Sequence, residues 1–135
     1  MGLYDAQTGD AQSAKPLDQV VSMTLGVGYV TPLQLSSAYA AFAARGMYCT
    51  PWLITSVKDA SGKSVATRGA DCKQALAPEV ADGVNAVLHQ VMQKGGTGSK
   101  LNFGKSDLAG KTGTITLNKA VWYAGYSTRL AAASV

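Results

Sequence analysis

Hydrophobic and polar residues follow a helical period between residues 31 and 46. The apolar positions on one helical face are Leu35, Ala38, Tyr39 and Phe42. Thr31 is a suitable N-cap, Pro32 suits the first helical position, and Gln34 completes a capping box. Gly46 is a natural C-terminal stop. The pattern therefore predicts a helix that begins after Thr31 and ends before Gly46, with capping rather than functional roles for the residues at its start.

A second stripe of apolar residues begins near Pro78. Its members are Val80, Val84, Val87, Leu88, Val91 and Met92, which share one face of a helix. Lys94 and the pair Gly95–Gly96 end the pattern. The single histidine of the chain, His89, falls on the opposite, polar face. We therefore expect His89 to be a solvated surface residue rather than a base or a metal ligand.

The remaining patterned segments are typical of strands. Residues 47–59 predict a strand, which Pro51 restricts to a sheet edge or to the start of the strand. A turn at 59–64 and a return strand at 64–67 complete a hairpin. Three later runs, separated by turns, predict consecutive strands at 108–116, 120–126 and 129–135. They follow a glycine-rich connector at 95–107.

The order of these elements indicates the fold class. Helices followed by strands in meander order favour an α+β fold, an antiparallel sheet with helices packed on its faces. Residues 1–16 are expected to be irregular or a helix remnant, and residues 17–30 an extended segment that leads into a turn. Tyr39, Phe42, Trp52 and Trp122 are expected in the core. Without a repeat or a linker, residues 1–135 are interpreted as a single domain.

Composition excludes several classes of protein. The chain is 47% apolar and 15% charged, which is typical of globular domains. Its 12 Lys and Arg residues are scattered and the net charge is only +4, so nucleic-acid binding is disfavoured. No apolar run approaches the roughly 18 residues of a membrane span, and no leader opens the chain. Any export signal would therefore lie outside this stretch.

The two cysteines, Cys49 and Cys72, leave two possibilities open. They can be buried free thiols, or they can form a disulfide that closes a loop of roughly twenty residues and contributes about 3 kcal/mol in the chain-entropy model. A disulfide would require an oxidising compartment. A catalytic role is disfavoured because His89 would have to be the partner of the thiol.

Lys111 lies between two glycines in the strand-like run LAGKTGTIT at 108–116. A phosphate loop is disfavoured, because the triplets at 104–106 and 110–112 have their upstream glycine one residue too far away and no helix follows Lys111. One alternative is a solvated lysine on an edge strand. The other is a cation that binds an anionic substrate.

The residue types at 111–114 suit acyl transfer to or from a peptide. The Lys111 ammonium can attract a carboxylate, and the Thr112 hydroxyl can bond to it. Gly113 lets an extended substrate lie against the strand. The backbone N–H of Thr114 is then free to bind a developing oxyanion, an interaction worth roughly 3 kcal/mol. Four residues alone are a weak signal, so the rest of the chain decides.

Read as a whole, the chain resembles the C-terminal half of the transpeptidase domain of penicillin-binding proteins, in the class that also carries a glycosyltransferase domain. The resemblance is carried by residues 28–63, 80–98 and 108–127, in that order and at similar spacing. It implies that Lys111, Thr112 and Gly113 are the third active-site motif. It also implies that Thr114 supplies the oxyanion N–H, and that Trp122, Gly125 and Tyr126 belong to a supporting strand. Cys49 and Cys72 resemble a pair found in some exported relatives.

The chain also departs from that family. It contains neither Ser-x-x-Lys nor Ser-x-Asn, Ile115 replaces a small polar residue, and the loop before residue 120 is short. The chain is thus either part of a larger enzyme or a reduced relative that cannot acylate. We expect the former.

The resemblance implies a serine D,D-transpeptidase that cross-links peptidoglycan stem peptides through an acyl-enzyme and is a target of β-lactam antibiotics. The expected partners are stem peptides, β-lactams and the remainder of the transpeptidase domain, with a homodimer as a further option. No cofactor or metal is expected, and the location is the extracytoplasmic face of a bacterial membrane. The alternatives are a β-lactamase or D,D-carboxypeptidase, and a non-catalytic module that binds peptidoglycan or a partner protein.

Overall fold

The structure, a computed structural model, describes residues 20–26, 28–104, 107–115, 117 and 119–135. Its helices are α1 (Pro32–Ala43) and α2 (Pro78–Val91), with short 3-10 helices at Val21–Leu25 and Ser99–Leu101. Its strands are β1 (Met47–Cys49), β2 (Ser56–Lys58), β3 (Ser64–Thr67), β4 (Cys72–Gln74), β5 (Ala109–Thr114), β6 (Val121–Tyr126) and β7 (Ala131–Ser134). The expectation for residues 1–16 lies outside the described residues.

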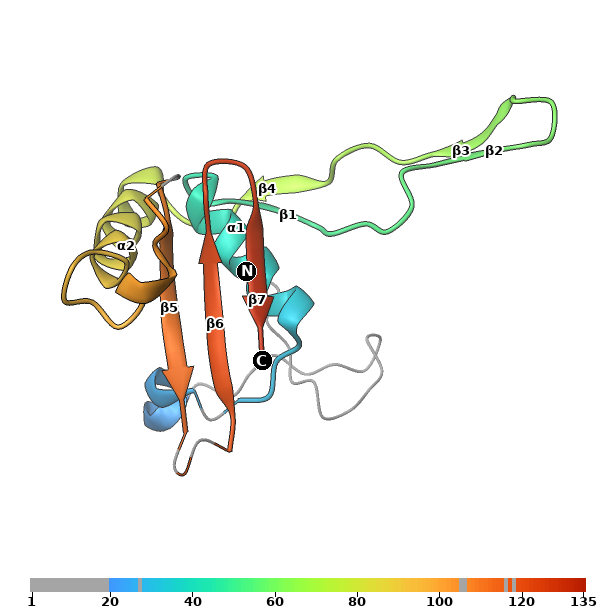
Figure 1. The fold of residues 1–135 in the computed structure, drawn as a ribbon. Helices are drawn as coiled ribbons and strands as arrows, with labels where there is room; N and C mark the ends of the chain where they lie inside the picture. Colours follow the sequence, from blue (N-terminus) through green and yellow to red (C-terminus); the bar gives the residue numbers. More distant parts are fainter. Residues whose placement is uncertain (1–19, 27, 105–106, 116, 118) are drawn as a thin grey trace.

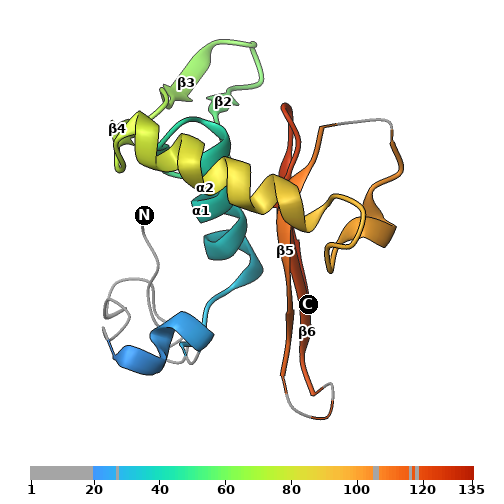
Figure 2. The same cartoon turned by 90° about the vertical axis from the view of Figure 1, so that its left-hand side faces the viewer.

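The main sheet has the order β5-β6-β7 and both pairs are antiparallel. This confirms the predicted α+β class and the three consecutive C-terminal strands. Helix α1 packs on one face of the sheet, whereas α2 runs past its β5 edge, as the two views show (Figures 1 and 2). The segment after α2, which includes the Ser99–Leu101 turn, passes to the other side (Figure 2).

Helix α1 begins and ends where the sequence predicts. The Thr31 hydroxyl accepts a hydrogen bond from the Gln34 N–H at 3.2 Å, and Gln34 Oε1 accepts one from the Thr31 N–H at 2.9 Å. The helix ends at Ala43. The chain then reverses through left-handed backbone at Arg45 and Gly46, where φ is 53° and 87°. A Cβ on Gly46 would lie 2.8 Å from the Gln74 side-chain amide, so glycine is required there for two reasons.

Changing Thr31 to alanine should lower the free energy of unfolding by about 1 kcal/mol, because it removes one half of the capping box. Urea unfolding followed by circular dichroism measures this loss. Thr55→Ala is the matched control, since within the described residues the Thr55 side chain makes no hydrogen bond. An equal loss in both variants would show that the cap contributes nothing.

Helix α2 is confirmed, but it is rotated relative to the predicted apolar stripe. Ala81 is fully buried, whereas Val80 and Val87 are 54% and 68% exposed. The inward face carries Asn85, whose amide donates to the Phe42 carbonyl at 3.1 Å. A polar side chain that satisfies the end of α1 thus takes a place that the hydrophobic pattern assigned to solvent.

Helix α2 also ends earlier than expected, at Val91 rather than at Lys94. The Met92 N–H bonds back to the carbonyl of His89 at 3.0 Å, and the Gly98 N–H returns to the Val91 carbonyl at 3.0 Å. These bonds form a tight turn that satisfies the carbonyls at the end of the helix.

The core lies between the two helices and the sheet. Its buried hydrophobic residues are Ala38, Ala41, Ala81, Met92, Ala109, Ala124 and Tyr126. Small alanine side chains allow the helices to approach the sheet closely. Tyr39 packs edge-on against Phe42 and Tyr126, with ring centroids 5.9 Å and 6.2 Å apart. Tyr39 and Phe42 thus take part in core packing, as the sequence predicts.

An ion pair joins the two helices at the edge of this core. The Arg45 guanidinium donates from Nε to Asp82 Oδ1 at 3.0 Å, and from a terminal nitrogen to Oδ2 at 2.6 Å. Its hydrogen bond to the carboxylate holds the pKa of Asp82 below its usual value. This contact fixes the start of α2 against the end of α1.

The predicted strand at 47–59 is wrong as a continuous element. It divides into β1 and β2, and β1 pairs with β4, a polar three-residue strand that the pattern did not indicate. Pro51 has no N–H to donate, and the chain leaves the ladder after the Thr50 N–H bonds to the Asp71 carbonyl at 2.9 Å. Cys49 and Cys72 lie opposite each other in this ladder and are joined by a disulfide.

The predicted hairpin is confirmed as β2 and β3, which project away from the rest of the molecule (Figure 1). Trp52 was expected in the core, but it lies in the segment between β1 and β2, where the Arg68 guanidinium stacks 3.1 Å from its ring centroid. The extended segment predicted at 17–30 is also wrong in part. Residues 21–25 form a 3-10 helix, which ends where Gly26 adopts left-handed backbone at φ 83°.

Candidate functional site

Strand β5 carries the Lys-Thr-Gly-Thr motif at one edge of the main sheet. Ala109 pairs with Tyr126, and the register continues without a shift to Thr114 opposite Val121. In the described part of the chain, no strand pairs with the other edge of β5. The motif therefore lies on an edge strand, as the sequence predicts.

The alternation of hydrogen bonds shows which backbone groups of β5 are free. The Ile115 N–H donates to the Ala120 carbonyl at 3.1 Å, which continues the register of the ladder. In an antiparallel pair, every second residue bonds to the partner strand and the residues between point away. Ala109, Lys111 and Gly113 thus bond to β6. The carbonyl of Thr112 and the N–H of Thr114 point to the open edge.

Lys111 is exposed and, among the described residues, forms no ion pair. Its Nζ donates to the Thr112 carbonyl at 2.5 Å. Because that carbonyl points to the open edge, the ammonium group lies at the edge rather than over the face of the sheet. A ligand alongside β5 would thus meet this positive charge.

The two threonines lie on the side of the sheet opposite to that of Lys111, because successive side chains alternate along a strand. The Thr112 hydroxyl donates to the Thr97 hydroxyl at 2.8 Å. Thr112 and Thr114 line a cavity of about 460 Å³ together with Thr97 and Leu101 from the segment after α2. The predicted site residues are thus neighbours on one strand, but Lys111 and the two threonines lie on opposite faces of the sheet. They can contact the same ligand only at the open edge of β5.

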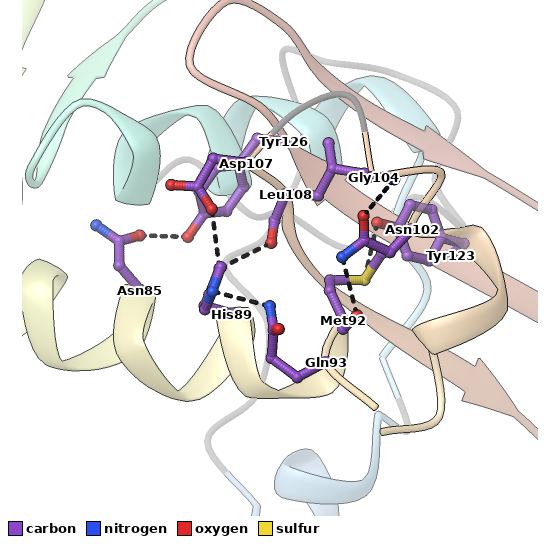
Figure 3. A network of polar contacts seen from close by, with 10 residues as sticks. All are labelled: Asn85, His89, Met92, Gln93, Asn102, Gly104, Asp107, Leu108, Tyr123 and Tyr126. Atoms are coloured by element: carbon purple, nitrogen blue, oxygen red, sulfur yellow. Dashed lines mark hydrogen bonds and ion pairs between the residues drawn. The ribbon is translucent and has the colours of Figure 1, made fainter. Parts of the chain in front are cut away.

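A network of polar contacts from α2 holds β5 in place (Figure 3). The His89 ring contacts the Leu108 carbonyl and the Asp107 carboxylate, both directly before β5. His89 was predicted to be a solvated surface residue, and its side chain is 41% exposed, but the ring also contacts a carbonyl of the neighbouring segment. With a single carboxylate nearby, it is not part of any cluster of metal-binding side chains within the described residues.

Two tyrosines of β6 extend this network (Figure 3). The Tyr126 hydroxyl bonds to Asn85 of α2, and burial, assisted by the nearby Tyr39, raises the pKa of Tyr126 to about 12. The Tyr123 hydroxyl lies 3.4 Å from the Met92 sulfur, and burial raises the pKa of Tyr123. A Cβ on Gly110 would lie 2.6 Å from the Tyr123 hydroxyl, so this glycine lets the ring lie against β5. Sequence reasoning missed Asn85 and His89, and their polar character at inward helical positions was the available signal.

Comparisons with known proteins place this geometry in a family. The family model described as the penicillin binding protein transpeptidase domain matches residues 1–132, so the chain belongs to that family. Penicillin-binding protein 1F of Bacillus subtilis is 34% identical over 110 residues, which cover 77% of this chain and 15% of the relative. Penicillin-binding protein 1A of Neisseria lactamica is 33% identical over 112 residues, covering 79% of this chain and 14% of the relative.

The structural comparison agrees with the family assignment. The PonA1 protein of Mycobacterium tuberculosis, solved in complex with penicillin V, is 26% identical and superposes with a TM-score of 0.71. The match covers 97% of this chain and 34% of that structure. The match covers about one seventh of the length of the two penicillin-binding proteins, 1F and 1A, named above. None of the helices in its described part is long and apolar enough to cross a bilayer.

Proposed function

We propose that this chain supplies the substrate-binding wall of a serine D,D-transpeptidase that cross-links peptidoglycan stem peptides. The observation that carries the proposal is β5 itself. An exposed lysine lies at an open strand edge, and the Thr114 N–H points to the same edge. Membership of the transpeptidase family supports assigning both groups to substrate binding.

The open edge of β5 suits the end of a stem peptide, which can lie beside it as an added strand. The Lys111 ammonium and the hydroxyls of Thr112 and Thr114 then hold the terminal carboxylate. Gly113 leaves room for the peptide to approach the backbone. The Thr114 N–H binds the carbonyl oxygen of the reacting peptide bond, where negative charge develops in the transition state.

The reaction needs a nucleophile from the parent protein. A serine oxygen attacks the carbonyl of the D-Ala–D-Ala bond, the terminal D-alanine leaves with a proton, and an ester joins the stem to the serine. The amine of a second stem attacks this ester, forms the cross-link and regenerates the serine. A β-lactam acylates the same serine when its ring opens.

No Ser-x-x-Lys or Ser-x-Asn occurs in these 135 residues, so we propose that the chain is inactive alone. We place the parent at the extracytoplasmic face of a bacterial membrane. The Cys49–Cys72 disulfide supports this location, because disulfides persist in oxidising compartments.

Fluorescent penicillin tests the proposal. The full-length parent should become covalently labelled, and the label should survive denaturing electrophoresis, whereas the 135-residue chain should stay unlabelled. Labelling of the short chain would contradict the missing nucleophile. A parent that never reacts would favour a non-catalytic binding module, and a parent that quickly releases the hydrolysed label would favour a β-lactamase or D,D-carboxypeptidase.

A further inference from the structure

The imidazole of His89 links α2 to the residues that lead into β5 (Figure 3). Its Nδ1 lies 3.2 Å from the Leu108 carbonyl oxygen and 3.1 Å from Asp107 Oδ1. A carbonyl and a carboxylate only accept hydrogen bonds, so Nδ1 carries a proton and donates to both. The link thus spans 19 residues of sequence and ends next to the first residue of β5.

The other ring nitrogen is also engaged. Nε2 lies 2.8 Å from the side-chain amide of Gln93, one turn further along α2. A glutamine amide donates through its nitrogen and, after rotation, accepts through its oxygen. The ring therefore keeps both partners whether it is neutral or charged.

We propose that His89 is a positioning residue for the Lys111–Thr114 strand, and that it acts by holding the Leu108 carbonyl against α2. This role rests on the function proposed above. Among the described residues, strand β5 has a partner strand on one side only, so its start depends on contacts outside the sheet. One helical turn earlier, Asn85 holds Tyr126, the register partner of Ala109. Two adjacent turns of α2 thus hold both strands of the same pair.

Few charged groups surround the imidazole of His89 in the described part of the chain. Asp107, on the segment before β5, is the one charged group in contact with the imidazole among the described residues. Tyr126, on β6, stays neutral below its pKa of about 12. On α2, Asp82 is paired with Arg45 of the α1 side. The cavity of about 450 Å³ beside the ring adds only uncharged groups, among them Gln90, Ser127 and Thr128.

Hydrogen exchange in this chain tests the positioning role without any assumption about function. The amides to follow are those of Ala109, Lys111 and Gly113, which bond to β6. His89→Gln removes the donor near Leu108, and exchange should accelerate about tenfold, the effect of one lost hydrogen bond. His89→Asn places an amide N–H near the position of Nδ1 and should restore slow exchange. Gln90→Leu, at the next helical position, is the matched control.

Acylation of the full-length parent by fluorescent penicillin gives the functional readout. His89→Gln should lower the second-order rate constant about tenfold, again the effect of one hydrogen bond. His89→Asn should restore most of the rate, because its amide N–H replaces the Nδ1 donor.

The outcomes separate the two proposals. Unchanged exchange in His89→Gln, or no recovery in His89→Asn, overturns the positioning role alone. So does faster exchange at β5 with no loss of acylation rate. A wild-type parent that does not react with penicillin overturns the proposed function instead. If His89→Gln does not fold, His89→Asn decides, because faster exchange of the three β5 amides or a lower acylation rate in that variant contradicts the role.

Discussion

In the full-length parent protein, Lys111→Ala should slow acylation by penicillin by about 10- to 100-fold. The ammonium group is exposed at an open strand edge and is not committed to a carboxylate in the described structure. A substrate carboxylate would displace its bond to the Thr112 carbonyl and exclude water from the pair. A hydrogen bond between charged groups is worth about 1.5–3 kcal/mol, which corresponds to this range of rates. The measurement is the second-order rate constant for labelling.

Two further variants sharpen this prediction. Lys58→Ala removes an exposed lysine from β2, on the projecting arm, and should leave the rate unchanged. Lys111→Arg keeps the charge but presents a planar fork, so its rate should fall between those of the wild type and the alanine variant. Because Lys111 is exposed, its replacement should change the free energy of unfolding by no more than about 0.5 kcal/mol. A rate within twofold of the wild type would remove Lys111 from the proposed site.

Local signals predicted the elements whose ends are encoded by neighbouring residues. The capping box at Thr31 and Gln34 and the left-handed turn at Gly46 depend on contacts a few residues apart, so α1 was predictable at both ends. The meander of β5, β6 and β7 was predictable for a similar reason, because its turns join strands that are adjacent in the sequence. The roles of the motif residues on β5 were likewise predicted from their residue types, before their geometry was known.

Elements that depend on distant partners were not predictable in this way. Strand β4 consists of Cys72, Lys73 and Gln74, which show no strand pattern, and it exists because β1 offers a ladder. The rotation of α2 follows from Asn85 and His89, whose partners lie 43 and 19 residues away. A hydrophobic pattern predicts that polar residues face solvent. It does not identify distant backbone carbonyls to which those residues can donate hydrogen bonds.

The same limit applies within the candidate site. The order of residue types predicted an edge strand, but not which of its backbone groups face outward. That depends on the phase of the ladder with β6, which the Ile115–Ala120 hydrogen bond reveals. Nor did the motif indicate the contact between Thr112 and Thr97, which joins the strand to the segment after α2. The proposed chemical roles could thus be inferred from four residues, whereas the contacts that position these residues come from elements elsewhere in the chain.

Met92→Ala should lower the free energy of unfolding by about 2–5 kcal/mol, the largest effect expected of a single core substitution here. Met92 is 1% exposed and is the largest fully buried side chain among the described residues. Its sulfur lies 3.4 Å from the Tyr123 hydroxyl, and a Cβ on Gly98 would lie 2.7 Å from the same sulfur. The side chain therefore fills the junction of α2, the segment that follows it and β6, and truncation leaves a cavity that these elements cannot easily close.

Urea unfolding of this chain measures the loss, and Met47→Ala is the matched control because Met47 is 38% exposed. Met92→Leu conserves most of the volume and should cost less than about 1.5 kcal/mol. The damage should also reach the candidate site, because Tyr123 lies between Met92 and Gly110 of β5. Faster amide exchange at Lys111 in Met92→Ala, but not in Met47→Ala, is therefore expected. Equal losses of stability in the two alanine variants would contradict this account of the core.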